Sequence, residues 1–258
     1  MKFRFLLGGR DLEMIEIRRL LQVHAQGCFH DRRLAWGAAL SAYREELLDA
    51  LRRGDTPVSI ELADDLPLEL FDRGRMVVVD HHGPLAGHDK PTSIEQVFGL
   101  LGLPAEAWTR HLALVAANDR AHVAGMRALG ATPAEIAEIR AADRAAQGVG
   151  DADEAEAVQA IGARRQEGRL TIVETRSRTS SAIADRMLPE MGGPGFERLL
   201  VVMPDTLAVF GDGIAVDALA HAFPGSWWGG DLPFAGYWGM QASVQRDSLL
   251  HKLVAKLR

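Results

Sequence analysis

The sequence is poor in cysteine, in long apolar runs and in net positive charge. Its single cysteine, Cys28, cannot form a disulfide within the chain. No apolar run approaches the roughly eighteen residues of a membrane span, and the amino-terminal run MKFRFLLGG is too short for a secretory signal core. These absences exclude a disulfide scaffold and a membrane-anchored protein, and we expect a cytoplasmic location.

The charge balance bears on the partners of the protein. Acidic residues outnumber basic ones by 35 to 29, which gives a formal net charge of -6. This balance argues against broad contact with long duplex nucleic acid or an anionic membrane, although a local basic pocket is compatible with it. The apolar content of 47% and charged content of 25% are those of an ordinary globular protein.

Apolar patterning predicts an α/β protein. Short apolar runs predict strands, and apolar residues recurring at intervals of three and four predict helices. Strands are expected at 2–7, 57–62, 76–79, 170–174, 199–203 and 207–210. Helices are expected at 12–21, 34–53, 93–103, 180–191 and 248–257, and across 105–146 with breaks at 118–119 and 130–133. Core packing or a homodimer contact explains the apolar stripe of 248–257.

This order predicts two domains. The first, residues 1–147, is expected to be built on a parallel sheet. An acidic, alanine-rich stretch at 148–168 is expected to form a linker helix whose charges are solvated. Residues 169–258 are expected to form a second, smaller α/β domain.

The most informative segment is residues 75–82, Arg-Met-Val-Val-Val-Asp-His-His. It predicts a buried strand that ends in one carboxylate and two imidazoles, Asp80, His81 and His82. Open α/β sheets place their active sites at such strand ends, and this mixture of side chains suits a transition or zinc-type metal. The alternative is a turn in which Asp80 only caps a loop.

Other acidic residues are expected near the same sheet edge. Each of them follows an apolar segment, and each has a structural alternative as a helix cap or a surface residue. They are Asp11 and Glu13 after the first strand, Glu61 with Asp64 and Asp65 after the second, and Asp119 in an apolar helix. Several carboxylates placed together repel one another unless cations compensate, so their joint convergence points to metal.

With these residues the sequence resembles the DHH phosphoesterase superfamily, which includes RecJ-like exonucleases, oligoribonucleases and cyclic-dinucleotide phosphodiesterases. Asp80-His81-His82 matches the motif that gives the family its name. Asp11-Leu12-Glu13 occupies the position of the family's Asp-x-Asp pair, and Glu61 and Asp119 occupy the positions of two single aspartates. The resemblance implies a parallel-sheet DHH-type domain followed by a smaller domain, with a dinuclear manganese-type centre. Residues 225–231, Gly-Ser-Trp-Trp-Gly-Gly-Asp, resemble the family's glycine-rich substrate loop.

The sequence also departs from the family pattern. Leu7 stands where a His or Asp ligand is usual, which implies a weaker second metal position. Glu replaces Asp at positions 13 and 61, and the glycine-rich loop lacks its usual His. His30 with Asp31 is a candidate replacement ligand, with a surface histidine as the alternative.

The resemblance implies a role for each residue. Asp11, Glu13, Glu61, His81 and Asp119 are expected as ligands of one or two divalent ions, Mn²⁺ foremost and Mg²⁺ as the alternative. Asp80 is expected to orient His81, and His82 is expected to contact the phosphate or to protonate the leaving oxygen.

Five residues of the second domain are candidates for substrate binding. Arg176 and Arg178 precede a predicted helix start and combine guanidinium groups with backbone N–H groups, with exposed surface arginines as the alternative. Trp228, Gly229 and Gly230 lie in the glycine-rich loop, where aromatic side chains either stack on a base or pack in the core.

The predicted function is metal-dependent hydrolysis of a phosphodiester or phosphomonoester bond in a small nucleotide or short oligonucleotide, by metal-activated water. The alternative is a catalytically degenerate, DHH-like protein that binds a nucleotide. A regulatory subunit that docks a protein through its aromatic loop has no positive support in the sequence.

Overall fold

The structure is a computed structural model that describes residues 2–242 and 246–257. The chain forms two compact units, Met1–His81 with Lys90–Asp119 and His82–Asp89 with Arg120–Arg258, which are described one at a time. Among the described residues, no helix combines the length and the apolar character needed to cross a bilayer.

The first unit is built on a parallel sheet of four strands in the order β2-β1-β3-β4. The strands are β1 (Phe3–Leu7), β2 (Phe29–His30), β3 (Thr56–Ile60) and β4 (Val77–Val79). The expected parallel sheet is therefore confirmed. Because the strands are parallel, the residues that follow β1, β3 and β4 meet at one edge of the sheet.

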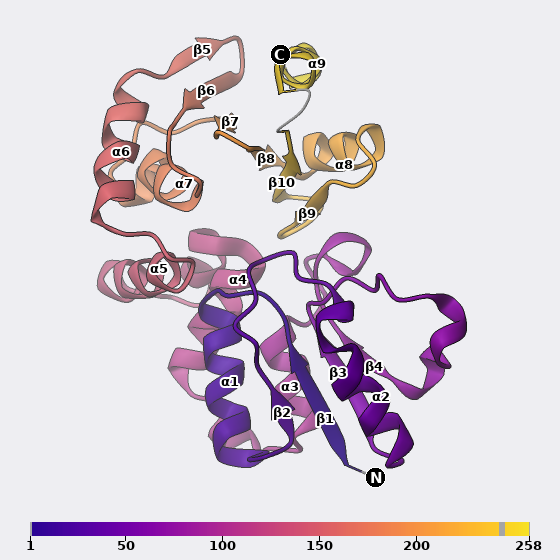
Figure 1. Cartoon of the computed structure of the whole chain (residues 1–258). Helices are drawn as coiled ribbons and strands as arrows, with labels where there is room; N and C mark the ends of the chain where they lie inside the picture. The colour runs from indigo at the N-terminus through magenta and orange to yellow at the C-terminus, as the bar shows by residue number, and fades with distance from the viewer. Residues whose placement is uncertain (1, 243–245, 258) are drawn as a thin grey trace. The chain divides into compact units, whose positions relative to one another are not determined.

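Helices cover both faces of this sheet (Figure 1). The first face packs against α1 (Leu12–His24), α3 (Ser93–Leu100) and the first half of α4 (Arg110–Ala128), and the second against η1 (Leu40–Tyr43) and α2 (Arg44–Arg52). Three short 3-10 turns complete this unit, η2 (Leu68–Leu70), η3 (Arg73–Arg75) and η5 (Ala105–Ala107). Burial on both faces explains why β1 and β3 read as apolar runs. The expectation of a buried strand holds only in part for β4, because β4 lies at the edge of the sheet and Val78 is 54% exposed.

The single helix predicted over 34–53 is wrong for its first third. Residues 34–39 form a loop, because Ala39 makes a parallel bridge with Ala63 that draws the chain into an extended conformation. The amide of Leu40 donates to the carbonyl of Ala63 at 2.8 Å, and Gly37 adopts a φ of 77°. A contact with a residue distant in the sequence outweighs the local helical spacing here.

The second unit holds a mixed sheet in the order β5-β6-β7-β8-β10-β9, in which only β6 and β7 are parallel neighbours. Its strands are β5 (Arg165–Glu167), β6 (Leu170–Glu174), β7 (Arg198–Val202), β8 (Thr206–Asp212), β9 (Trp227–Gly229) and β10 (Ala235–Gln241). The sequence did not predict β9 and β10, because their many glycines are typical of a loop.

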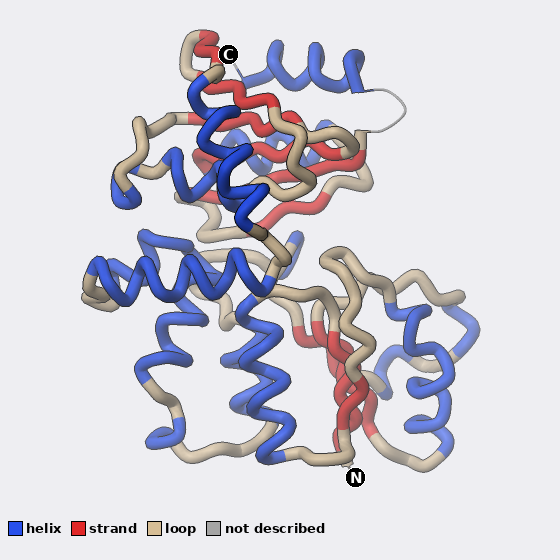
Figure 2. Tube along the Cα trace, turned by 60° about the vertical axis from the view of Figure 1, so that its left-hand side comes forward, coloured by secondary structure: helices blue, strands red, loops and turns tan. Residues whose placement is uncertain are grey.

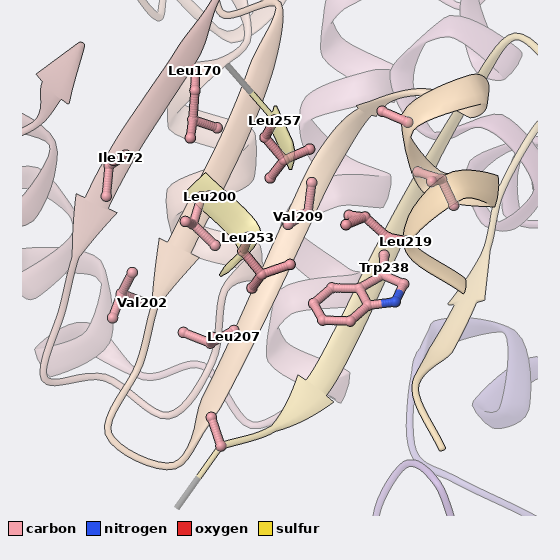
Figure 3. Close-up of a cluster of buried hydrophobic side chains, with 13 residues drawn as sticks. Leu170, Ile172, Leu200, Val202, Leu207, Val209, Leu219, Trp238, Leu253 and Leu257 are labelled. Carbon is pink, nitrogen blue, oxygen red and sulfur yellow. The ribbon is translucent and has the colours of Figure 1, made fainter. Parts of the chain in front are cut away.

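Helices also flank the second sheet on both faces (Figure 2). One face packs against α6 (Asp151–Gly162) and α7 (Ser181–Met187), and the other against α8 (Gly213–Ala222) and α9 (Arg246–Leu257). The remaining elements are α5 (Pro133–Ala146), η4 (Gly83–Leu85) and η6 (Pro189–Met191). Figure 3 shows Leu253 and Leu257 of α9 within the buried cluster that also contains Trp238, so core packing accounts for the carboxy-terminal apolar stripe.

The segment predicted as a solvated linker helix is an integral part of the second unit. Residues 148–168 form α6 and the edge strand β5, and Ala157 and Ala160 are buried against the sheet. Helix α5 also belongs to this unit and packs against α7. The division between compact units therefore follows Asp119, whereas the sequence pattern placed a domain boundary at 147.

Helix α4 continues through the break predicted at 118–119 and is instead broken at Ala121 and His122. His122 has a φ of 53° and a ψ of -140°, values that are rare for a residue with a side chain. The predicted cap at the next break is confirmed, since Thr132 caps α5 and Pro133 occupies its first turn.

Candidate metal centre

Three carboxylates surround His81 in the first unit. The Nε2 atom of His81 lies 3.5 Å from Glu13 Oε2 and 3.7 Å from Glu61 Oε1, and it forms an ion pair with Asp119. Ligand atoms of Glu61, His81 and Asp119 lie within 4.8 Å of one another. The structure therefore brings together four of the five predicted metal ligands.

The four side chains come from different parts of the fold. Glu13 lies in the first turn of α1, Glu61 directly follows β3, His81 follows β4, and Asp119 lies in α4. The parallel sheet places the first three at its carboxyl edge. The sequence pattern predicts this convergence for the strand ends, and a charged residue in an apolar helix is the signal for Asp119.

The electrostatics of the cluster favour a cation. Glu13 is 1% exposed, and its burial together with the charge of Asp119 raises its pKa to about 8. Burial disfavours the imidazolium of His81, but the carboxylates of Asp119 and Glu13 outweigh that effect and raise its pKa to about 12. Carboxylates this close together repel one another unless positive charge compensates, so the cluster suits a cation.

The donor set also fits a metal. Three carboxylates and one imidazole are ligands that Mn²⁺ and related ions accept. Glu13 is held in place, since its Oε1 accepts a hydrogen bond of 2.9 Å from the amide of Ile94 at the start of α3. Its second oxygen, Oε2, is the atom that faces His81.

The backbone around Glu61 is held in an unusual conformation. Glu61 has a φ of 50°, and its amide donates to the carbonyl of Val79 at 2.9 Å. Gly8 packs against it so closely that a Cβ atom at position 8 would lie 2.9 Å from the carbonyl carbon of Glu61. The glycine after β1 is therefore required for β3 to present Glu61.

The structure also separates Glu61 from its two neighbours. Both carboxylate oxygens of Asp64 accept hydrogen bonds from Arg73, at 2.8 and 2.9 Å. Asp65 accepts from the amide and hydroxyl of Ser41, at 2.8 and 2.5 Å. Of these three acidic residues, Glu61 is the one beside His81.

Asp11 has the structural role that was its alternative. It is the N-cap of α1, and its Oδ1 accepts a hydrogen bond of 2.7 Å from the amide of Met14. His30 is exposed on β2, and the carboxylate of Asp31 pairs with Arg18. Leu7 is fully buried in the core. Metal binding by Asp11 stays a prediction.

No protein-family model matches the chain, and no curated protein matches it significantly. A solved DHH domain, described as a member of a family of ribosomal proteins, gives a TM-score of 0.50 at 17% identity, covering 99% of this chain and 86% of that one. RecJ from Thermus thermophilus, solved with Mn²⁺, gives 0.51 at 15% identity, covering 99% of this chain and 51% of RecJ. This chain has the DHH fold. It spans about half the length of that RecJ chain.

The three residues of the DHH motif have different surroundings. The carbonyl of Asp80 accepts a hydrogen bond of 2.9 Å from Gln96, and His81 belongs to the carboxylate cluster. His82 groups with the second unit, where its ring packs edge-on against Tyr237 at 6.5 Å between centroids. A Cβ atom at Gly229 would lie 3.3 Å from the ring of His82.

The predicted substrate-binding residues are not brought together. Strands β6 and β9 run in opposite directions, so their carboxyl ends lie at opposite ends of the sheet. Arg176 and Arg178 follow the end of β6, whereas Gly230 follows the end of β9. Both arginines are exposed, and they pair with Glu156 at 2.9 Å and Asp205 at 2.6 Å.

The aromatic residues of the glycine-rich segment also divide between two roles. Trp238 is fully buried, and Trp228, its partner across the strands, packs against the same core. Tyr237, Gly229 and His82 lie on the other face of β9 and β10. Stacking of Trp228 on a base therefore stays a prediction, as do substrate contacts by Gly229 and Gly230.

One pair at this segment was not identified from the sequence. His88 Nδ1 lies 2.6 Å from Asp231 Oδ1, and the amide of His88 donates to the carbonyl of Leu232 at 3.0 Å. Because 143 positions separate the two side chains, no local pattern indicates this contact.

Proposed function

We propose that this chain is a divalent-metal-dependent phosphoesterase that hydrolyses a phosphodiester or phosphomonoester bond in a small nucleotide or short oligonucleotide. The observation that carries the proposal is the buried cluster of Glu13, Glu61, His81 and Asp119. The likeness to RecJ, a protein solved with Mn²⁺, supports the choice of ion. The net charge of -6 favours short substrates over long duplexes.

The cluster residues would hold the ion, with Asp11 as a fifth candidate. A bound divalent ion supplies positive charge to the phosphate oxygens and lowers the pKa of an attacking water molecule. Glu13 and Asp119 keep the ring of His81 in place. In this proposal Asp80 orients His81, and His82 contacts the phosphate or donates the proton that the leaving oxygen requires.

The test is hydrolysis of dinucleotides, cyclic dinucleotides and short oligomers in the presence of Mn²⁺. His81→Ala is expected to abolish product release, because it removes the side chain that all three carboxylates approach. His30→Ala is the matched control, since His30 is exposed on β2. Undiminished hydrolysis by the His81 variant would contradict the assignment.

A second pair of variants tests the carboxylates. Glu61→Gln is expected to weaken Mn²⁺ binding in calorimetry, because the amide keeps the size of the side chain but removes its charge. Asp65→Asn changes an acidic residue on the same segment whose carboxylate bonds to Ser41. Equal Mn²⁺ affinity in the two variants would argue against Glu61 as a ligand.

A catalytically degenerate nucleotide-binding protein is the second candidate. Two observations favour it: Leu7 is buried at a position where a ligand is expected, and Asp11 Oδ1 bonds to the helix backbone. Elemental analysis distinguishes the candidates. Protein that retains no transition metal but binds nucleotide in the presence of chelator would favour this second function.

A further inference from the structure

The first unit contains an open hollow that the proposed metal chemistry does not use. It lies in the loop before η1, has a volume of about 380 Å³, and is lined by residues 34–39, 41 and 42. Trp36 lies in this loop with 40% of its surface exposed, and it is the most exposed of the five tryptophans. An indole this accessible, beside a hollow of this volume, provides a flat surface for a planar ligand.

The loop is attached to the backbone that carries the proposed metal ligands. A Cβ atom at Gly9 would lie 2.6 Å from the Cα of Trp36, so the two backbones are in direct contact. On its other side the loop pairs with Ala63, two residues beyond Glu61. The hollow therefore borders the carboxyl edge of the parallel sheet, where Glu61 and His81 lie.

The distance from this loop to the metal ligands matches the size of a nucleotide. Gly8 touches Glu61 and Gly9 touches Trp36. With 3.8 Å between consecutive Cα atoms, the Trp36 backbone lies within about 12 Å of the Glu61 carbonyl. An indole ring extending from that backbone is close enough to stack on the base of a nucleotide whose phosphate is at the metal ligands.

A cationic residue follows Gly9 in the chain, next to the backbone that contacts Trp36. Arg10 separates Gly9 from Asp11, is exposed, and makes no hydrogen bond or ion pair with any residue that the structure describes. Arg4, Arg18 and Arg32 of the same unit each pair with a carboxylate. A guanidinium on the residue after Gly9 and an exposed indole on the loop that Gly9 contacts suit a ligand that has both an anionic and an aromatic part.

We propose that Trp36 and Arg10 form a nucleotide-recognition site, in which Trp36 stacks on a base and Arg10 binds a phosphate. The proposal deepens the proposed function by making the base part of what the protein recognises. Phosphoesters without a base are then poor substrates. An apolar peptide is a weaker candidate occupant, because the guanidinium and the nearby carboxylates would contact it without forming complementary charge pairs.

The first test measures binding without hydrolysis. Calorimetry with AMP in the presence of chelator is expected to show binding to the unmodified protein and a loss of roughly 5- to 150-fold in affinity for Trp36→Ala, the range for one stacked base. Trp36→Phe keeps an aromatic ring and is expected to retain most of the affinity. Leu68→Ala is the control, because Leu68 is 80% exposed in the same unit. No AMP binding, or equal affinity in Trp36→Ala, would overturn the site.

The same assay tests Arg10. Arg10→Gln is expected to weaken AMP binding about tenfold and to leave adenosine binding unchanged, because a guanidinium contacts the phosphate and not the base. Equal loss for both ligands would remove Arg10 from the site.

The second test uses hydrolysis of a dinucleotide and of its abasic analogue in Mn²⁺. Trp36→Ala is expected to raise the KM for the dinucleotide and to leave the slower hydrolysis of the abasic analogue unchanged. Equal effects on both substrates would overturn the role of the base. If the unmodified protein hydrolyses neither substrate but AMP binding depends on Trp36, the phosphoesterase proposal fails and the recognition site stands.

Discussion

The strongest stability prediction concerns a buried ionic network in the second unit. Asp185 on α7 is 1% exposed and accepts hydrogen bonds from Arg140 Nη2 at 2.8 Å and Arg144 Nη1 at 2.5 Å. His122 Nε2 lies 3.0 Å from the same carboxylate. The network joins α4, α5 and α7 at the strained residue of α4.

The expected cost of disrupting the network follows from its burial. Asp185→Asn removes the charge that balances Arg140, whose side chain is 3% exposed. Loss of one partner of a buried ion pair costs about 3–5 kcal/mol. Asp143 also bonds to Arg140, at 2.7 Å, so we expect the lower end, about 3 kcal/mol. That is a large part of the stability of a typical domain.

Urea unfolding followed by circular dichroism measures this cost. The control is Glu174→Gln, which removes one partner of the Arg165–Glu174 pair, where both side chains are 56% exposed and the atoms lie 2.7 Å apart. An exposed pair contributes about 0–1 kcal/mol. A loss in Asp185→Asn no larger than in the control would refute the reasoning, because burial would then add nothing to the pair.

The same network predicts a pH dependence. Burial alone would raise the pKa of Asp185, but its bonds to His122 and Arg140 outweigh burial and hold the pKa well below its usual range. A carboxyl with a depressed pKa stabilises the fold at pH values above its unfolded pKa, near 3.9. We therefore expect this contribution to be lost as pH falls below about 4, and Asp185→Asn to reduce that acid sensitivity.

Three further predictions concern the metal centre. In the absence of metal, the free energy of unfolding is expected to fall as pH rises from 4.5 to about 8, because the pKa of Glu13 is raised to about 8 in the folded state. Glu13→Gln should flatten this slope in urea titrations. Asp11→Ala is expected to cost about 1 kcal/mol in the same assay through loss of the α1 cap, and a cost near zero would show that the cap is unimportant. Gly8→Ala is expected to lower both the melting temperature and the gain in melting temperature on adding Mn²⁺, because the new methyl group meets the backbone of Glu61; an unchanged gain would show that Glu61 tolerates the shift.

Most of the fold of the first unit could be predicted from the sequence. The strands at 3–7, 56–60 and 77–79 are short apolar runs that end at charged or glycine residues, and burial on both faces makes that pattern strong for the first two. The loop at 34–39 could not be predicted, because Ala39 is held by Ala63, a residue far away in the chain. The break at His122 is equally non-local, since a contact of 3.0 Å between its ring and the carboxylate of Asp185 accompanies it.

The candidate site was predictable to the same degree. Residue type and position in the chain predict Glu13, His81 and Asp119. They favour Glu61 but leave Asp64 and Asp65 as alternatives to it, because a shift of one residue exchanges the faces of a strand. The ion pair of Asp64 with Arg73 decides that choice, and it depends on tertiary contact. For the same reason Trp36 was not recognised: its importance comes from contact with Gly9.

The departures from the DHH pattern have a common physical consequence for the metal centre. Leu7 removes a ligand and joins the core, while glutamate at position 13 gains a methylene that lets one oxygen bond to the amide of Ile94 and the other face His81. The carboxylate that approaches the metal position is thus fixed by the start of α3 and not by a short side chain on the loop. A ligand that is both longer and anchored at a second point keeps its position when a neighbouring ligand is lost. The two substitutions are therefore compatible with each other, and in the proposed function a single ion would be held by Glu13, Glu61, His81 and Asp119.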